Sequence, residues 1–181
     1  MKVFLIRKYI IMKKSNVGKI GVLFVCASLL ILSGCVNYIK PDLGAVARVD
    51  ARVPFVDGKI SGSVLKTNDL QLEYAFHGNG DSFEITGKLV FSRGITASYP
   101  VLDRFILRVN FLDAGGKVIA SENISPNISS FNEVPDVVRI KASGLIPSGS
   151  VAIAFNYYGR LTGASLRGGG DSWEVYYMPF D

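Results

Sequence analysis

The sequence predicts an all-β fold in which two antiparallel sheets pack face to face as a sandwich. Apolar and polar residues alternate with a period of two in four separate runs, which places one set of side chains on a buried face and the other set in water. Turn signals rich in Gly, Asn and Asp separate these runs. No window carries a sustained helical stripe with caps. A closed barrel is the alternative for the same pattern of about eight short strands.

The alternation and the turn signals locate the expected strands along the chain. The four alternating runs are 70–76, 83–91, 105–112 and 151–157. Aromatic and β-branched residues fill their buried positions, as strands prefer. Asp113-Ala114-Gly115-Gly116 separates the third run from a strand at 117–122, and this pair is the clearest hairpin. Further strands are expected at 136–142 and 172–180.

The first 34 residues have the composition of a targeting segment. They hold six of the 20 basic residues and no acidic residue. The basic stretch Met12–Lys19 leads into an apolar run from Ile20 to Leu32, and small residues follow. These are the parts of a secretory signal peptide. Thirteen helical residues span about 20 Å, less than the hydrocarbon core of about 30 Å, which argues against a membrane-spanning anchor. A start at Met12 gives a leader of ordinary length, and a start at Met1 gives a longer one.

The apolar run ends in Leu32-Ser33-Gly34-Cys35. These four residues resemble the lipobox of bacterial lipoproteins, in which the cysteine thiol receives diacylglycerol and the leader is cut just before the cysteine. The resemblance implies that Cys35 becomes the first residue of the mature protein and is its lipid-modification site. Two or three acyl chains, of the palmitate kind, would form a stable membrane anchor. The residue after the cysteine is Val36 and not Asp. In this family, that choice implies that the lipoprotein is sent to the outer membrane of the bacterial cell envelope.

The predicted domain organisation has three parts. Residues 1–34 are the cleaved lipoprotein signal peptide, 35–53 are the lipidated N-terminus and a tether, and 54–181 are the β-sandwich domain. The tether has one Pro, one Gly, scattered charge and no sustained period. An early edge strand around 45–51 is the alternative for part of it.

The charge and the cysteines exclude several classes of function. Removing the six basic residues of the leader leaves fourteen basic and fifteen acidic residues. A near-neutral domain without a Lys/Arg cluster has no electrostatic footprint for nucleic acid, so no nucleic-acid partner is expected. Cys26 leaves with the leader and Cys35 carries the lipid, so no intrachain disulfide is expected.

The sequence also predicts that the protein is not an enzyme. His77 is the only histidine, and no Gly-x-Ser-x-Gly elbow accompanies it. It stands beside Gly78-Asn79-Gly80 and is expected to be a turn residue. One histidine cannot supply the several ligands that zinc needs, so neither a metal nor a cofactor is expected. A hydrolase with a carboxylate pair remains an alternative, but no sequence feature selects which two acids would meet.

The most unusual local composition runs from Gly159 to Gly170, a Gly-rich stretch that is expected to be a loop joining the last two strands. Arg160, Arg167, Trp173 and Tyr176 are the candidate rim of a ligand-binding groove here. Aromatic and Arg side chains are good binding anchors. They also make good sheet faces, so at least half of the aromatic residues in this region must belong to the core.

The succession of a strand with Ile-Thr-Gly-Lys-Leu-Val at 85–90 and a hairpin at 105–119 looks like small immunoglobulin-like domains of bacterial envelope proteins. The resemblance implies an immunoglobulin-like sandwich. Fold does not by itself specify function. The leader, the tether and the absence of a catalytic motif favour a non-catalytic envelope lipoprotein whose partner is another envelope protein. The alternative is a module that binds a carbohydrate or a small ligand through the candidate rim.

Overall fold

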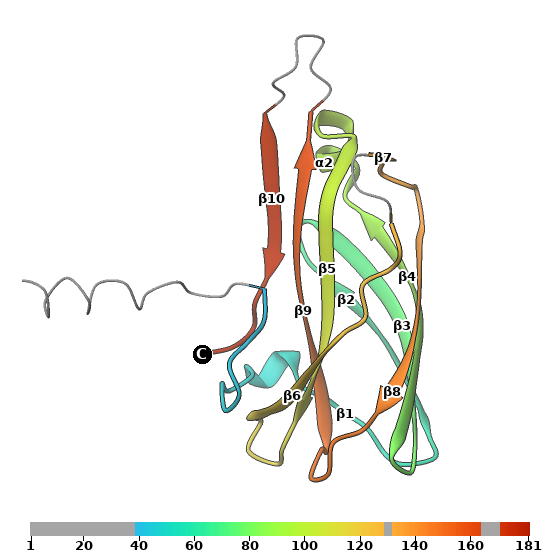
Figure 1. Ribbon diagram of the computed structural model, residues 1–181, viewed down its shortest axis with the longest axis vertical. Coiled ribbons are helices and arrows are strands. Elements are labelled where there is room, and N and C mark those ends of the chain that lie inside the picture. Colours follow the sequence, from blue (N-terminus) through green and yellow to red (C-terminus); the bar gives the residue numbers. More distant parts are fainter. Residues whose placement is uncertain (1–38, 129–131, 164–170) are drawn as a thin grey trace, which may run out of the picture. The chain divides into compact units, whose positions relative to one another are not determined.

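The computed structural model describes residues 39–128, 132–163 and 171–181. These residues form two antiparallel sheets that pack face to face, which confirms the predicted all-β sandwich (Figure 1). The signal peptide, both candidate start residues and Cys35 lie outside the described residues, as does Arg167. No helix in the described ranges is long and apolar enough to cross a membrane.

The first sheet has the strand order β1-β9-β5-β6, with β10 also paired to β9 and β7 also paired to β5. Its strands are β1 (Val53–Pro54), β5 (Val101–Leu112), β6 (Val118–Asn123), β7 (Asn132–Glu133), β9 (Ala152–Thr162) and β10 (Ser172–Tyr177). β9 pairs with β5 along its whole length. The other edge of β9 pairs with β1 at its start and with β10 from Tyr157 to Thr162.

The second sheet has the strand order β2-β3-β4-β8. Its strands are β2 (Ile60–Lys66), β3 (Leu70–Asn79), β4 (Ser82–Phe91) and β8 (Val138–Leu145). The predicted alternation is visible in β3, where every second residue from Leu70 to Gly78 is buried. A six-residue helix, α2 (Arg93–Ser98), and a 3-10 turn, η2 (Val49–Ala51), complete the described elements.

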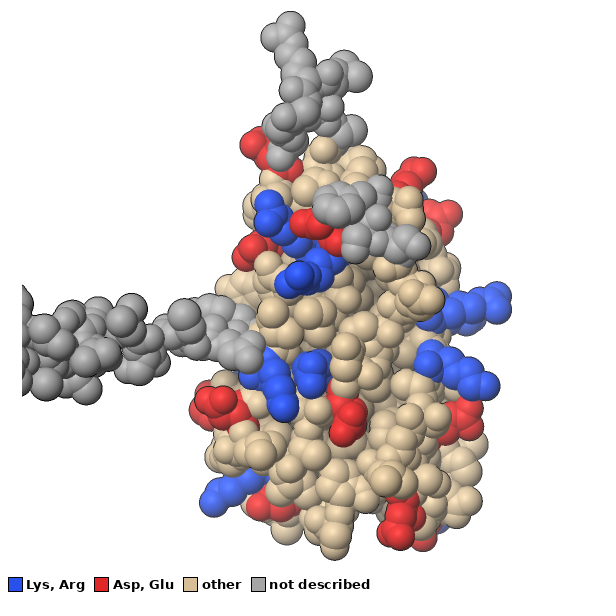
Figure 2. Space-filling view, viewed as in Figure 1, with Lys and Arg blue, Asp and Glu red and all other residues tan. Residues whose placement is uncertain are grey.

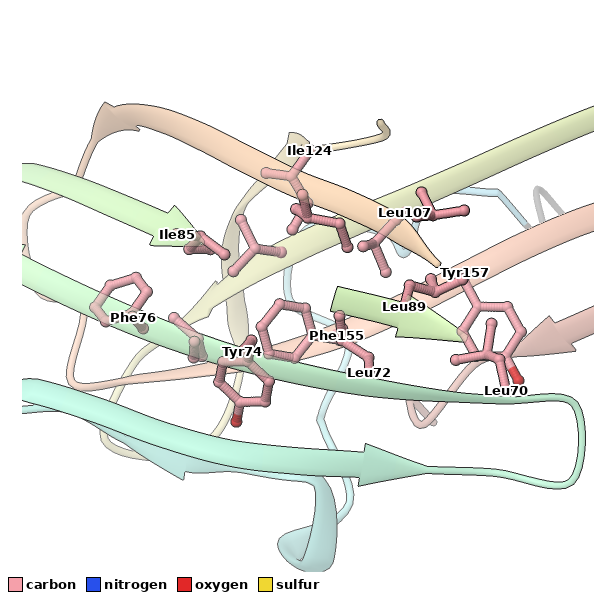
Figure 3. Packing of buried hydrophobic residues seen from close by; sticks show 14 of the residues in the cluster. Leu70, Leu72, Tyr74, Phe76, Ile85, Leu89, Leu107, Ile124, Phe155 and Tyr157 are labelled. Atoms are coloured by element: carbon pink, nitrogen blue, oxygen red, sulfur yellow. The ribbon is translucent and has the colours of Figure 1, made fainter. Parts of the chain in front are cut away.

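The core lies between the sheets and is rich in aromatic rings (Figure 3). Phe76 of β3 is fully buried and stacks on Phe83 of β4, with 5.9 Å between ring centroids. Tyr157 of β9 is fully buried as well, and its hydroxyl hydrogen-bonds Thr67 at 2.6 Å and donates to Asp69 at 3.1 Å. Burial raises the pKa of Tyr157 far above its ordinary value, so this hydroxyl keeps its proton and links the two sheets.

Two strands are longer than the alternation predicts. β9 continues from Tyr157 to Thr162, so the first residues of the expected 159–170 loop belong to a strand. Gly159 permits this because a Cβ there would come within 3.0 Å of the side chains of Val175 and Phe105. β3 continues to Asn79, so His77 is a strand residue paired with Glu84, and its expected position in a turn is corrected.

The N-terminal segment 39–52 packs on the outer face of the first sheet. The backbone amides of Gly44 and Ala47 donate to Val118 and Gly116, at 2.8 and 2.9 Å. Ala47 is fully buried, and it forms a second small core with residues of β5, β6 and β9: Leu112, Val118, Ala152 and Ala154. From Ile39 onward the stretch expected to be a tether is therefore part of the folded domain. The edge strand expected around 45–51 is present as isolated bridges at Val46 and Ala47 and the η2 turn.

Candidate functional site

The outer face of the first sheet carries arginine and tyrosine side chains from three neighbouring strands. The strand register places Arg104, Arg160 and Glu174 in one row across β5, β9 and β10, and Ile106, Tyr158 and Tyr176 in the next row. We call these six residues the Arg–Tyr surface. The residues that alternate with them, including Leu107, Tyr157 and Val175, point into the core.

Polar contacts hold part of the Arg–Tyr surface in place. The Tyr158 hydroxyl donates a hydrogen bond of 2.8 Å to Glu174. Burial, with a smaller contribution from Glu174, raises the pKa of Tyr158 above its ordinary value. Arg160 forms an ion pair with Asp103, with 3.5 Å between Nε and Oδ2. On the side of the molecule that Figure 2 displays, charged side chains of both signs are scattered over a largely uncharged surface.

The described residues of the candidate rim are divided between two faces of the sheet, and Arg167 lies outside the described residues. Arg160 and Tyr176 lie on the Arg–Tyr surface. Trp173 is three residues before Tyr176, so it points to the opposite face of β10, where it stacks on Tyr99 with 5.8 Å between ring centroids. Both aromatic side chains remain accessible, with Trp173 48% and Tyr176 63% exposed. Trp173 and Tyr176 are only three residues apart, but the alternation of side chains along β10 places them on opposite faces of the sheet.

The chain enters the domain next to the Arg–Tyr surface. Asn156 of β9 lies on the same face, one row from Tyr158, and its side-chain amide donates a hydrogen bond of 3.1 Å to the carbonyl of Ile39. Asn110 of β5 in turn donates to the Asn156 side chain at 2.8 Å. Both asparagines are fully buried. This buried amide pair fixes where the segment that follows Cys35 meets the sandwich.

A shallow groove of about 670 Å³ lies at one end of the second sheet. Nine residues of β3, β4 and β8 line it: His77, Asn79, Ser82, Phe83, Glu84, Lys141, Ser143, Gly144 and Leu145. Lys141 forms an ion pair of 3.7 Å with Glu84, and Leu145 is 74% exposed. We call this the polar groove. Sequence reasoning missed it because Glu84 and Lys141 are far apart in the chain and only the pairing of β4 with β8 brings them together.

The polar groove has the donors and acceptors of a binding surface. Its only carboxylate is Glu84, so it does not contain the acid pair that the hydrolase alternative requires. Across the described part of the chain, no three His, Cys, Asp or Glu side chains are grouped so that they could hold a metal ion.

The fold and these surfaces define a class: a two-sheet antiparallel β-sandwich with an Arg–Tyr surface on one side and a polar groove on the other. No protein-family model matches the chain, and no curated protein is similar to it in sequence. The functional argument therefore rests on the residues themselves.

Proposed function

We propose that the protein is a bacterial lipoprotein, held on the outer membrane by lipid on Cys35, whose sandwich is a non-catalytic module that binds another envelope protein. One observation carries the proposal: Leu32-Ser33-Gly34-Cys35 stands at the end of a basic and then apolar leader. The docked segment supports it, because Ile39, four residues after the proposed lipidation site, is already hydrogen-bonded to Asn156 of the domain.

Substituting Cys35 tests the anchor. In Cys35→Ser we expect no lipid on the protein, an uncleaved leader and a changed distribution between membrane and soluble fractions, because serine lacks the thiolate nucleophile that carries the thioether. Mass spectrometry of the N-terminus and fractionation measure these outcomes. Cys26→Ser is the matched control, since this cysteine lies inside the apolar run and its loss leaves lipidation intact. A wild-type mature N-terminus that is unmodified, or an intact leader, contradicts the proposal.

The strand order supports an immunoglobulin-like assignment of the domain. In that family, strands A, B and E share one sheet, and G, F and C share the other, with C′ beside C in some members. Here β3, β4 and β8 are neighbours in one sheet and correspond to A, B and E. In the other sheet β10, β9, β5 and β6 are neighbours and correspond to G, F, C and C′. β2 is then an additional strand that pairs with β3. We infer that the domain is immunoglobulin-like on this correspondence.

The polar groove is the surface that we assign to the protein partner. It combines the exposed side chain of Leu145 with the charged pair Glu84 and Lys141. Exposed apolar residues with a polar surround are typical of protein-binding sites. Figure 1 shows that the strands forming the groove belong to the sheet of β3, β4 and β8, away from the sheet that carries the docked N-terminal segment.

A carbohydrate-binding module is the second candidate, and the half-exposed stack of Trp173 on Tyr99 favours it. Aromatic rings offer flat apolar faces on which a sugar ring can pack. Trp173 is the only tryptophan, so its fluorescence reports this surface directly. We expect an oligosaccharide ligand to shift the emission and Tyr99→Ala to weaken the response. A glycan screen that leaves the Trp173 emission unchanged removes this candidate.

A further inference from the structure

We propose that the outer face of the first sheet lies against the membrane, with the Arg–Tyr surface in contact with the phosphates of phospholipid headgroups. This inference rests on the proposed lipid anchor at Cys35. The inference adds an orientation to the proposed anchor. One face of the sandwich is held on the bilayer, and the opposite sheet, with the polar groove, faces the surrounding compartment.

The length of chain between the anchor and the domain limits the orientation. Cys35 and Ile39 are four residues apart, so their Cα atoms are separated by at most about 14 Å even in a fully extended chain. The Ile39 carbonyl is held by Asn156, which is an interior residue of β9 on the outer face of the first sheet. A lipid on Cys35 would therefore be attached within this distance of the middle of the face.

Other orientations need a longer chain. Packed sheets lie about 10 Å apart, so placing the second sheet on the membrane would put Ile39 about 20 Å from the bilayer once the side chains on both outer faces are included. Standing the domain on the Thr162 end of β9 would raise Asn156 by six residues, or about 20 Å. At the Ala152 end the distance is about 13 Å, and the turn before this strand adds to it. A short anchor therefore favours the face that carries Asn156.

The chemistry of the Arg–Tyr surface matches a layer of headgroups. Arg104 and Arg160 are direct partners across β5 and β9, with Glu174 on the other side of Arg160. Because Arg160 already forms an ion pair with Asp103, Arg104 is the guanidinium of this row that we expect to bind a phosphate, through paired hydrogen bonds. Tyr158 and Tyr176 in the next row combine an apolar ring with a polar hydroxyl, the property that enriches tyrosine at membrane interfaces.

Thiol labelling tests the orientation in the mature lipidated protein. Cys26 is removed with the leader and the lipid blocks the thiol of Cys35, so an introduced cysteine is the only reactive thiol. Tyr176→Cys places it on the Arg–Tyr surface, and Thr86→Cys, an exposed residue of β4, is the matched control on the second sheet. Each variant is reconstituted in phosphatidylethanolamine–phosphatidylglycerol vesicles, and its reaction with a membrane-impermeant maleimide is timed.

We expect Tyr176→Cys to react about tenfold more slowly than Thr86→Cys in vesicles, the ratio for a docked state favoured by about 1.4 kcal/mol. The two rates should converge when detergent dissolves the vesicles. Adding Arg104→Glu and Arg160→Glu should speed the reaction at residue 176 while the protein still floats with the vesicles. Equal rates in floating protein, or slower reaction at residue 86, overturn the orientation alone. A protein that does not float overturns the lipid anchor and this inference with it.

Discussion

Replacing Phe76 by alanine is expected to lower the free energy of unfolding by about 3–5 kcal/mol. The Phe76 ring lies among the core side chains and is fully buried (Figure 3). Its centroid is 4.9 Å from that of Phe55 and 5.9 Å from that of Phe83. Truncation removes these contacts and leaves a cavity that the surrounding strands fill only in part. Because whole domains are stable by only about 5–15 kcal/mol, this single change removes a large share of the stability.

Urea unfolding of the mature protein measures this loss. Phe76→Leu is the conservative control and should cost less, since most of the volume stays filled. Tyr176→Ala removes an aromatic side chain that is 63% exposed and should change stability by only about 0.5 kcal/mol. A loss below about 1 kcal/mol in Phe76→Ala would mean that this residue does not occupy the core.

Replacing Asn156 by alanine is expected to cost about 2–3 kcal/mol and to loosen the segment 39–52. The change removes the donor to the Ile39 carbonyl and the acceptor for the Asn110 amide. Asn110 Oδ1 already has no hydrogen-bond partner among the described residues, so the substitution leaves a more weakly satisfied amide inside the protein. Buried polar groups without partners are costly because they have lost their water as well.

Hydrogen exchange at the backbone amides of Gly44 and Ala47 measures how far the segment 39–52 loosens. Both amides donate hydrogen bonds from this segment, to the carbonyls of Val118 and Gly116. If the local free energy of opening falls by about 2 kcal/mol, exchange there should become about 30-fold faster. Asn132→Ala, at an exposed asparagine of β7, is the control and should leave both amides unchanged. Unchanged exchange in Asn156→Ala would show that the segment is held without the asparagine pair.

Alternation of apolar and polar residues correctly predicted β3 and β4 because these strands bury one face only. It also located β9, although both faces of this strand are buried from Ala152 to Tyr157. β2 was missed: five of its seven residues are exposed, and Gly62 and two serines break the apolar pattern. β1 and β7 are two residues long and leave no period to detect. The position of His77 was wrong because Gly78 looks like a turn signal in the sequence, but in the structure it pairs with Phe83 inside the sheet.

The sequence by itself determined that the domain is all-β, because a period of two specifies locally which side chains each strand buries. The choice of a two-sheet sandwich over a closed barrel came from the structure. The sequence also supplies the basic and apolar N-terminal stretch and Cys35, on which the proposed anchor depends. Only the tertiary structure decided which residues become neighbours: Asn110 with Asn156, Glu84 with Lys141, and Trp173 with Tyr99. The physical reason is that local periodicity sets the face of a residue, whereas the register between distant strands depends on the packing of the whole sandwich.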